Sequence, residues 1–256
     1  MVSAMATSKT TDFTHAEGGL NSDGYWFPGR WIGGTTMILG PLLLFTGVLL
    51  RIQFNFFFPK QLAAFQQHPT LMTASYSCFL AGNILMWPAI ATLARLIGLK
   101  RPHWALWGGT LVIFGLFART FHAGVDHLAF QLVRVQDLHL ATQAVADSYG
   151  AFQIVSGLTA AILFGWIVLA IGAYLSGTMR LLRSIALGLM SALMIGVLKG
   201  SSPTSVVATG GLCIALVPLG VKLLREHPTP SFRKLAGWCL FVAALIALMF
   251  YFGQLG

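Results

Sequence analysis

Long apolar runs separated by short polar breaks make up most of this chain. A membrane-spanning helix needs about 20 predominantly apolar residues, and the pattern predicts helices at about 31–50, 70–94, 103–131, 148–176, 181–198, 203–222 and 232–253. Pro102 precedes the third run, and Ser202-Pro203 has the pattern of a helix N-cap followed by proline in the first turn. The hydrophobic pattern therefore predicts an all-α integral membrane protein, a bundle of seven transmembrane helices.

Composition supports this prediction and bounds the domain organisation. The chain has 256 residues, of which 56% are hydrophobic and only 9% are charged, whereas soluble domains carry about 25% charged residues. Residues 25–256 are expected to form one membrane domain. Residues 1–24 are small and polar, and are expected to form a flexible cytoplasmic tail. We expect a multi-pass protein of the cell membrane.

The distribution of lysine and arginine predicts the orientation. Eleven of these residues fall on the N-terminal side of the predicted bundle and four on the other side, with Arg119 inside a helix. Basic residues collect in cytoplasmic loops, so we expect the N-terminus in the cytoplasm and the C-terminus outside. The four on the outer side are Arg51, Lys60, Arg134 and Lys199. This orientation also accounts for the net charge of +9, and we expect no nucleic-acid partner because no basic cluster alternates with aromatic residues.

Two connections on the predicted outer side differ from plain loops. Residues 51–69 hold an aromatic cluster beside Pro59 and Lys60, which is typical of an interfacial or partly re-entrant segment. Residues 132–147 are expected either to continue the third helix above the bilayer or to form a short surface helix. We expect these segments to act as plain interfacial anchors, or alternatively as a lid over a site on the outer side.

The third predicted helix contains the most informative stretch, ARTFHAGVDHLAF at 118–130. Arg119, His122 and Asp126 follow one another at spacings of three and four, so they share a helix face, and His127 is rotated by about 100° from Asp126. A charged group at the bilayer centre costs at least about 2.5–3.5 kcal/mol. These groups must therefore pair or face protein or water, and ionisable groups inside a membrane mark a candidate site by default.

Neighbouring predicted helices carry polar residues at matching depth. The fourth helix supplies Tyr149 and Gln153, and the second supplies Tyr76 and Asn83. Together with Phe130 on the third helix, these residues are the candidate substrate-binding and proton-transfer groups around the four ionisable residues of 119–127. We expect them to form one polar pocket in the outer half of the bundle, with Arg119 holding the polar head of a substrate.

Enzyme chemistry on a lipid-soluble substrate is the function that we expect from this pocket. A carboxylic acid in an apolar, low-dielectric site can act as a general acid, and aromatic rings such as that of Phe130 stabilise cations. Asp126 would donate a proton, His122 would set its protonation state, and Tyr149 or His127 would take the final proton. No cofactor or metal is expected.

In size, helix number and embedded acids the chain resembles the small seven-helix membrane-bound terpene cyclases. The resemblance covers the whole hydrophobic domain. It implies a prenylated substrate, acid-initiated cyclisation or isomerisation without metal, and Asp126 as the proton donor.

Other functions fit the same residues. A small-molecule or ion transporter, or a resistance or immunity protein, would use the pocket for binding, with Asp126 as its charged group. His122, Asp126 and His127 also form an H-x3-D-H pattern suited to a metal hydrolase, and paired histidines suit a haem protein less well because no other predicted helix contains one. In a purely structural interpretation, Arg119 bridges to Asp126 with His122 between them, holding the helices in register.

Overall fold

The computed structural model describes residues 26–148, 154–193, 196–226 and 231–255. Within these ranges the chain forms helices joined by turns and irregular connections, and no strand occurs. The helices are α1 (Arg30–Leu50), α2 (Phe58–Gln67), α3 (Pro69–Gly98), α4 (Pro102–Val135), α5 (Leu138–Ser148), α6 (Ile154–Leu175), α7 (Leu181–Gly188), the short 3-10 helix η2 (Leu189–Ala192), α8 (Pro203–Arg225) and α9 (Phe232–Leu255).

Six of the seven predicted helices are present as candidate membrane spans. Within the described ranges, α1, α3, α4, α6, α8 and the Ala236–Gly253 part of α9 are long and apolar enough to cross a membrane. Their surfaces expose many large aliphatic and aromatic side chains, which is the expected exterior of a helix bundle surrounded by hydrocarbon. The chain therefore has the pattern of a multi-pass membrane protein. The predicted tail at 1–24 lies outside the described residues.

Glycines let the main helix pairs approach closely. A Cβ atom added to Gly47 of α1 would lie 2.7 Å from the backbone oxygen of Ser75 in α3, and one added to Gly82 of α3 would lie 2.6 Å from the backbone nitrogen of Leu44. Gly165 of α6 packs in the same way on the backbone of α4. Small residues at helix contacts compensate for the missing hydrophobic driving force between helices in lipid. These contacts fix the α1–α3 and α4–α6 pairs on which the site is built.

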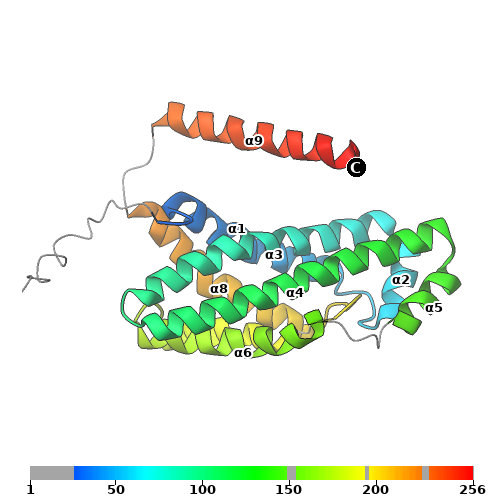
Figure 1. The fold of residues 1–256 in the computed structure, drawn as a ribbon, viewed down its shortest axis with the longest axis horizontal. Helices are drawn as coiled ribbons and strands as arrows, with labels where there is room; N and C mark the ends of the chain where they lie inside the picture. Colours follow the sequence, from blue (N-terminus) through cyan, green and yellow to red (C-terminus); the bar gives the residue numbers. More distant parts are fainter. Residues whose placement is uncertain (1–25, 149–153, 194–195, 227–230, 256) are drawn as a thin grey trace, which may run out of the picture.

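The two ends of the bundle differ in character (Figure 1). At one end the C-terminal ends of α3, α6 and α8 meet, as shown by the hydrogen bond from Thr178 Oγ1 to the Leu96 oxygen and by the cavity that Lys100 and Lys222 share. We call this the basic end, and it is the end predicted to face the cytoplasm. The opposite end carries α2 and α5, and we call it the capped end.

The capped end agrees with the predictions for its two connections. Residues 51–57 form turns that lead into α2, which starts with Pro59 in its first turn. α4 continues to Val135 and is followed by the short helix α5, so both of the expected forms of residues 132–147 occur in sequence. The rings of Phe65 in α2 and Phe130 in α4 stack with centroids 4.4 Å apart. An apolar cluster thus closes this end of the bundle.

The fifth predicted helix, 181–198, is wrong as a continuous membrane span. α7 and η2 end at Ala192, and Leu193 adopts an extended conformation. Farther along, Gly196 and Leu198 have positive φ angles of 144° and 50°. The segment begins at the basic end after the turn at Thr178, and its far end reaches the capped end, where the Gly200 N–H donates to the Phe56 oxygen at 2.9 Å. The half-length helix is therefore followed by irregular backbone at the described residues 193 and 196–202, and we call these residues the broken segment.

α9 stands apart from the other helices (Figure 1). In the described part of the chain it contacts none of them, and its side chains from Gly237 to Gly253 are all exposed. The site described below is built without α9.

Candidate functional site

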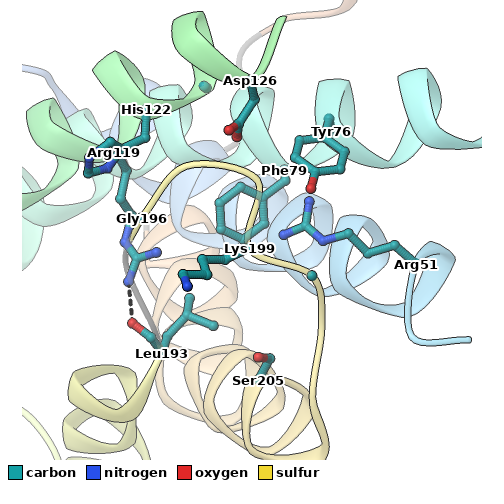
Figure 2. A pocket seen from close by; sticks show the side chains of 12 residues that line it. Arg51, Tyr76, Phe79, Arg119, His122, Asp126, Leu193, Gly196, Lys199 and Ser205 are labelled. Atoms are coloured by element: carbon teal, nitrogen blue, oxygen red, sulfur yellow. Dashed lines mark hydrogen bonds between the residues drawn. The ribbon is translucent and has the colours of Figure 1, made fainter. Parts of the chain in front are cut away.

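A small cavity lies between α3, α4, the end of α1 and the broken segment. Its volume is about 40 Å³, well below the roughly 300–1,000 Å³ of pockets that bury drug-sized ligands. Ionisable and aromatic side chains form much of its wall (Figure 2). The lining residues are Arg51, Tyr76, Phe79, Arg119, His122, Ala123, Asp126, Leu193, Gly196, Lys199, Gly200 and Ser205.

Arg119 and Asp126 on α4 both bind the backbone of the broken segment. Arg119 Nη2 donates a hydrogen bond to the Leu193 carbonyl oxygen at 2.7 Å, drawn as the dashed line in Figure 2. Asp126 Oδ1 accepts a hydrogen bond from the Leu198 N–H at 2.5 Å. Both side chains are buried, with 7% of each residue exposed. Seven residues apart, they lie on one face of α4, as the sequence predicts.

These two contacts explain why charged side chains lie inside this helix. Irregular backbone at membrane depth survives only where protein or a cavity satisfies its polar groups, and an unpaired buried backbone group costs about 1–3 kcal/mol. The broken segment leaves such groups at Leu193 and Leu198, and Arg119 and Asp126 satisfy them. The structural expectation of an Arg119–Asp126 bridge is not met, since no ion pair joins these two described residues.

Arg51 enters the cavity from the C-terminal end of α1. Its guanidinium lies over the rings of Tyr76 and Phe79, 4.4 and 4.7 Å from their centroids, and its Nε donates to Ser201 Oγ at 3.2 Å. Only 5% of the residue is exposed. Its Nη1 is buried without a hydrogen-bond partner among the described residues. One side of this guanidinium is thus held in place, and the other is available to a ligand.

Lys199 brings a third cation from the broken segment itself. Its Nζ lies 5.5 Å from the centroid of the Phe56 ring. The next residue packs so closely on the loop after α1 that a Cβ on Gly200 would lie 2.8 Å from the Cα of Phe56. Figure 2 shows Arg51, Arg119 and Lys199 reaching the cavity from three different elements.

Positive charge therefore exceeds negative charge around the cavity. Three cationic side chains line it, and Asp126 is the one carboxylate among the lining residues. Ser205 also lines it, in the first turn of α8, where a helix carries partial positive charge. The arrangement favours a small anion over a cation.

No protein-family model, curated protein or solved structure matches the chain. Its site must therefore be interpreted from its own geometry.

The structure brings together four of the residues singled out in the sequence. Arg119, His122, Asp126 and Tyr76 all line the cavity. His122 is half-buried, and its Nδ1 lacks a hydrogen-bond partner among the described residues. The Tyr76 hydroxyl donates to Gln61 Oε1 at 3.1 Å, so α2 is tied to the cavity wall. Side chains of α3 and α4 thus meet at one cavity.

Three other candidates lie away from the cavity. His127 is exposed on the surface of α4, and Phe130 is buried in the apolar cluster of the capped end. Asn83 is buried and joins α3 to α4 by donating to the Leu116 oxygen and to Thr120 Oγ1. None of these three lines the cavity. Tyr149 and Gln153 lie outside the described residues.

Arg51 and Lys199 line the cavity but are not among the candidate site residues that the sequence indicated. Both occur at ends of apolar runs, where a basic side chain normally reaches the headgroup region. A weak signal was available for Lys199, because the sequence KGSS at 199–202 combines a cation with glycine and helix-capping serines. For metal chemistry, the described part of the chain holds no group of three histidine, cysteine or acidic side chains able to bind an ion.

Proposed function

We propose that this protein binds a small anionic solute or anionic group within the membrane and serves as a transporter or binding protein for it. The single observation that carries the proposal is the convergence of Arg51, Arg119 and Lys199 on one cavity that holds a single carboxylate. A buried charged group is costly unless it is paired, and Arg51 Nη1 is buried with no hydrogen-bond partner among the described residues. A carboxylate-like or phosphate-like anion in the cavity would pair with the Arg51 guanidinium.

The broken segment adds a second argument. In many transporters, substrate sites lie where a membrane helix is interrupted, with helix N-termini directed at anionic groups. Here the irregular backbone of 196–200 and the first turn of α8 both border the cavity. The volume of about 40 Å³ suits a small anion or a single anionic group of a larger molecule. The site lies toward the capped end, the predicted outer side.

The test is an anion screen on the purified full-length protein, read as the unfolding temperature in detergent. Chloride, acetate and phosphate salts are compared at constant ionic strength, and the dissociation constant of the most stabilising anion is measured. Arg51→Gln and Lys199→Gln should each weaken its binding by about 10- to 150-fold, because a charge-assisted hydrogen bond contributes about 1.5–3 kcal/mol.

Lys60→Gln is the matched control. Lys60 is an exposed cation at the same end and does not line the cavity. Binding should be unchanged in this variant. The proposal fails if no anion stabilises the wild type, or if Lys60→Gln weakens binding as much as Lys199→Gln. Lys199 is only half-buried, so its variant keeps the test valid if the loss of Arg51 impairs folding.

A second candidate is the membrane-embedded enzyme that acts on a prenylated or other lipid-soluble substrate. Asp126 and His122 face one cavity together with the rings of Tyr76 and Phe79, which supports acid-initiated chemistry with aromatic stabilisation of a cation. A prenyl chain needs far more space than about 40 Å³, so this function requires the cavity to widen. The test is a panel of prenylated and lipid substrates without added metal, analysed by mass spectrometry. A product that disappears in Asp126→Asn would favour the enzyme.

A further inference from the structure

A second, larger cavity lies at the basic end, about 220 Å³ in volume. It is formed where the C-terminal ends of α3, α6 and α8 come together, far along the bundle from the cavity of Figure 2. Leu96 and Leu223 contribute to its apolar side, and Lys100 and Lys222 contribute its cations. The turn after α6 adds hydroxyl groups from Ser176 and Thr178.

The hydroxyl groups are placed by the turn itself. Ser176 is buried, with 3% exposed, and its Oγ lies 2.8 Å from Thr178 Oγ1. Gly177 between them has a φ of 73°, a conformation that glycine adopts without strain. The turn is joined to α3 through the hydrogen bond from Thr178 to the Leu96 oxygen. The turn at 176–178, which lines the cavity, is therefore held in place by the fold.

The charges of this cavity are only partly balanced within the protein. Lys222 Nζ lies 3.6 Å from Glu226 Oε1, and the Lys222 side chain is 71% exposed. Lys100 is exposed and forms no ion pair with any described residue. Cations near the C-terminal carbonyl groups also stabilise helices. An experiment on the cavity must therefore separate helix stabilisation by the lysines from ligand binding by them.

We propose that this cavity binds the phosphate headgroup of an anionic phospholipid. Basic pockets between membrane helices on the cytoplasmic side bind anionic headgroups, and this cavity combines two lysines with an apolar wall at the predicted cytoplasmic end. Its volume is below the roughly 300–1,000 Å³ of whole-ligand pockets, which fits a headgroup whose acyl chains stay in the bilayer. The site is independent of the proposed anion cavity.

Native mass spectrometry of the full-length protein tests the proposal. Phosphatidylglycerol and phosphatidylcholine with the same acyl chains are offered in equal amounts, and retained lipid is counted. The wild type should retain more phosphatidylglycerol, and Lys100→Gln/Lys222→Gln should reduce that preference by up to about 30-fold, the scale expected for two lysines at an anionic surface. Lys100→Arg/Lys222→Arg should restore it.

Arg225→Gln is the control for general surface charge. Arg225 is an exposed cation in the last turn of α8 and does not line the cavity. Its variant should keep the preference for phosphatidylglycerol. The proposal is overturned if the double lysine variant retains the lipid as the wild type does, or if Arg225→Gln loses it equally. Displacement of the lipid by millimolar inorganic phosphate would also overturn it, because the site would then serve free phosphate.

Discussion

Asp126 offers a direct test of how the broken segment is held inside the membrane. Its carboxylate accepts the Leu198 N–H within the bundle, at a residue whose φ is 50°. Asp126→Leu removes the acceptor and leaves this buried N–H unpaired, which should cost about 1–3 kcal/mol of local stability. Asp126→Asn keeps an acceptor oxygen and loses only the difference between a charged and a neutral hydrogen bond, about 1 kcal/mol.

Hydrogen exchange measured by mass spectrometry localises this effect. Amides of residues 196–202 should exchange about 5- to 150-fold faster in Asp126→Leu than in the wild type, the factor that corresponds to about 1–3 kcal/mol. Asp126→Asn should give an intermediate rate. Helices α1 and α3 should keep their protection, because neither contains Asp126 nor belongs to the broken segment.

Asp147→Leu is the matched control, since Asp147 is an exposed acid on α5. It should leave exchange in the broken segment unchanged. Unchanged exchange at 196–202 in Asp126→Leu would refute the proposal that Asp126 stabilises the broken segment. A uniform rise over the whole chain would refute it too, because the contact would then support global folding rather than this segment.

Two further predictions concern helix packing and orientation. Gly115→Ala should lower the free energy of unfolding by about 1–3 kcal/mol through overpacking, because the added Cβ would lie 2.7 Å from the Cα of Ile162. A Cβ added at Gly124 on the same helix would have no atom within 4 Å, so Gly124→Ala should be neutral or stabilising. An equal loss of unfolding free energy in the two variants would contradict this packing. In a cysteine-free background, a membrane-impermeant thiol reagent should label an introduced cysteine at Gln66 in intact cells and one at Leu99 only after permeabilisation, and the reverse pattern would contradict the orientation.

The sequence predicts the main helices because lipid imposes a simple requirement on them. Every backbone polar group of a spanning segment must be satisfied internally, so a long apolar run becomes a helix. Residues 181–198 obey the same composition and still break at Ala192. Gly188, Ser191 and Gly196 are weak local signals for a break. The decisive partners, Arg119 and Asp126, come from a distant helix, and no local pattern reveals that pairing.

The site is predictable to a similar degree. Helical spacing places Arg119, His122 and Asp126 on one face, and all three line the cavity. Helical spacing does not predict the net charge of the cavity, because that charge also depends on side chains that other elements bring to the cavity. In the sequence, Arg51 and Lys199 each look like ordinary interfacial cations. Tertiary packing brings both to the cavity that the polar face of α4 also lines. Because both cations line the cavity, we propose that the site recognises an anion rather than using Asp126 as a proton donor.

Anomalous scattering from bromide can show directly whether the cavity binds an anion. A crystal of the full-length protein soaked in bromide would be measured at the bromine absorption edge. We predict an anomalous peak within the cavity, within hydrogen-bonding distance of Arg51 Nη1 and beside Lys199 and Arg119, and its loss in Lys199→Gln crystals. Bromide peaks confined to the surface, with none in the cavity at saturating concentration, would contradict the anion site.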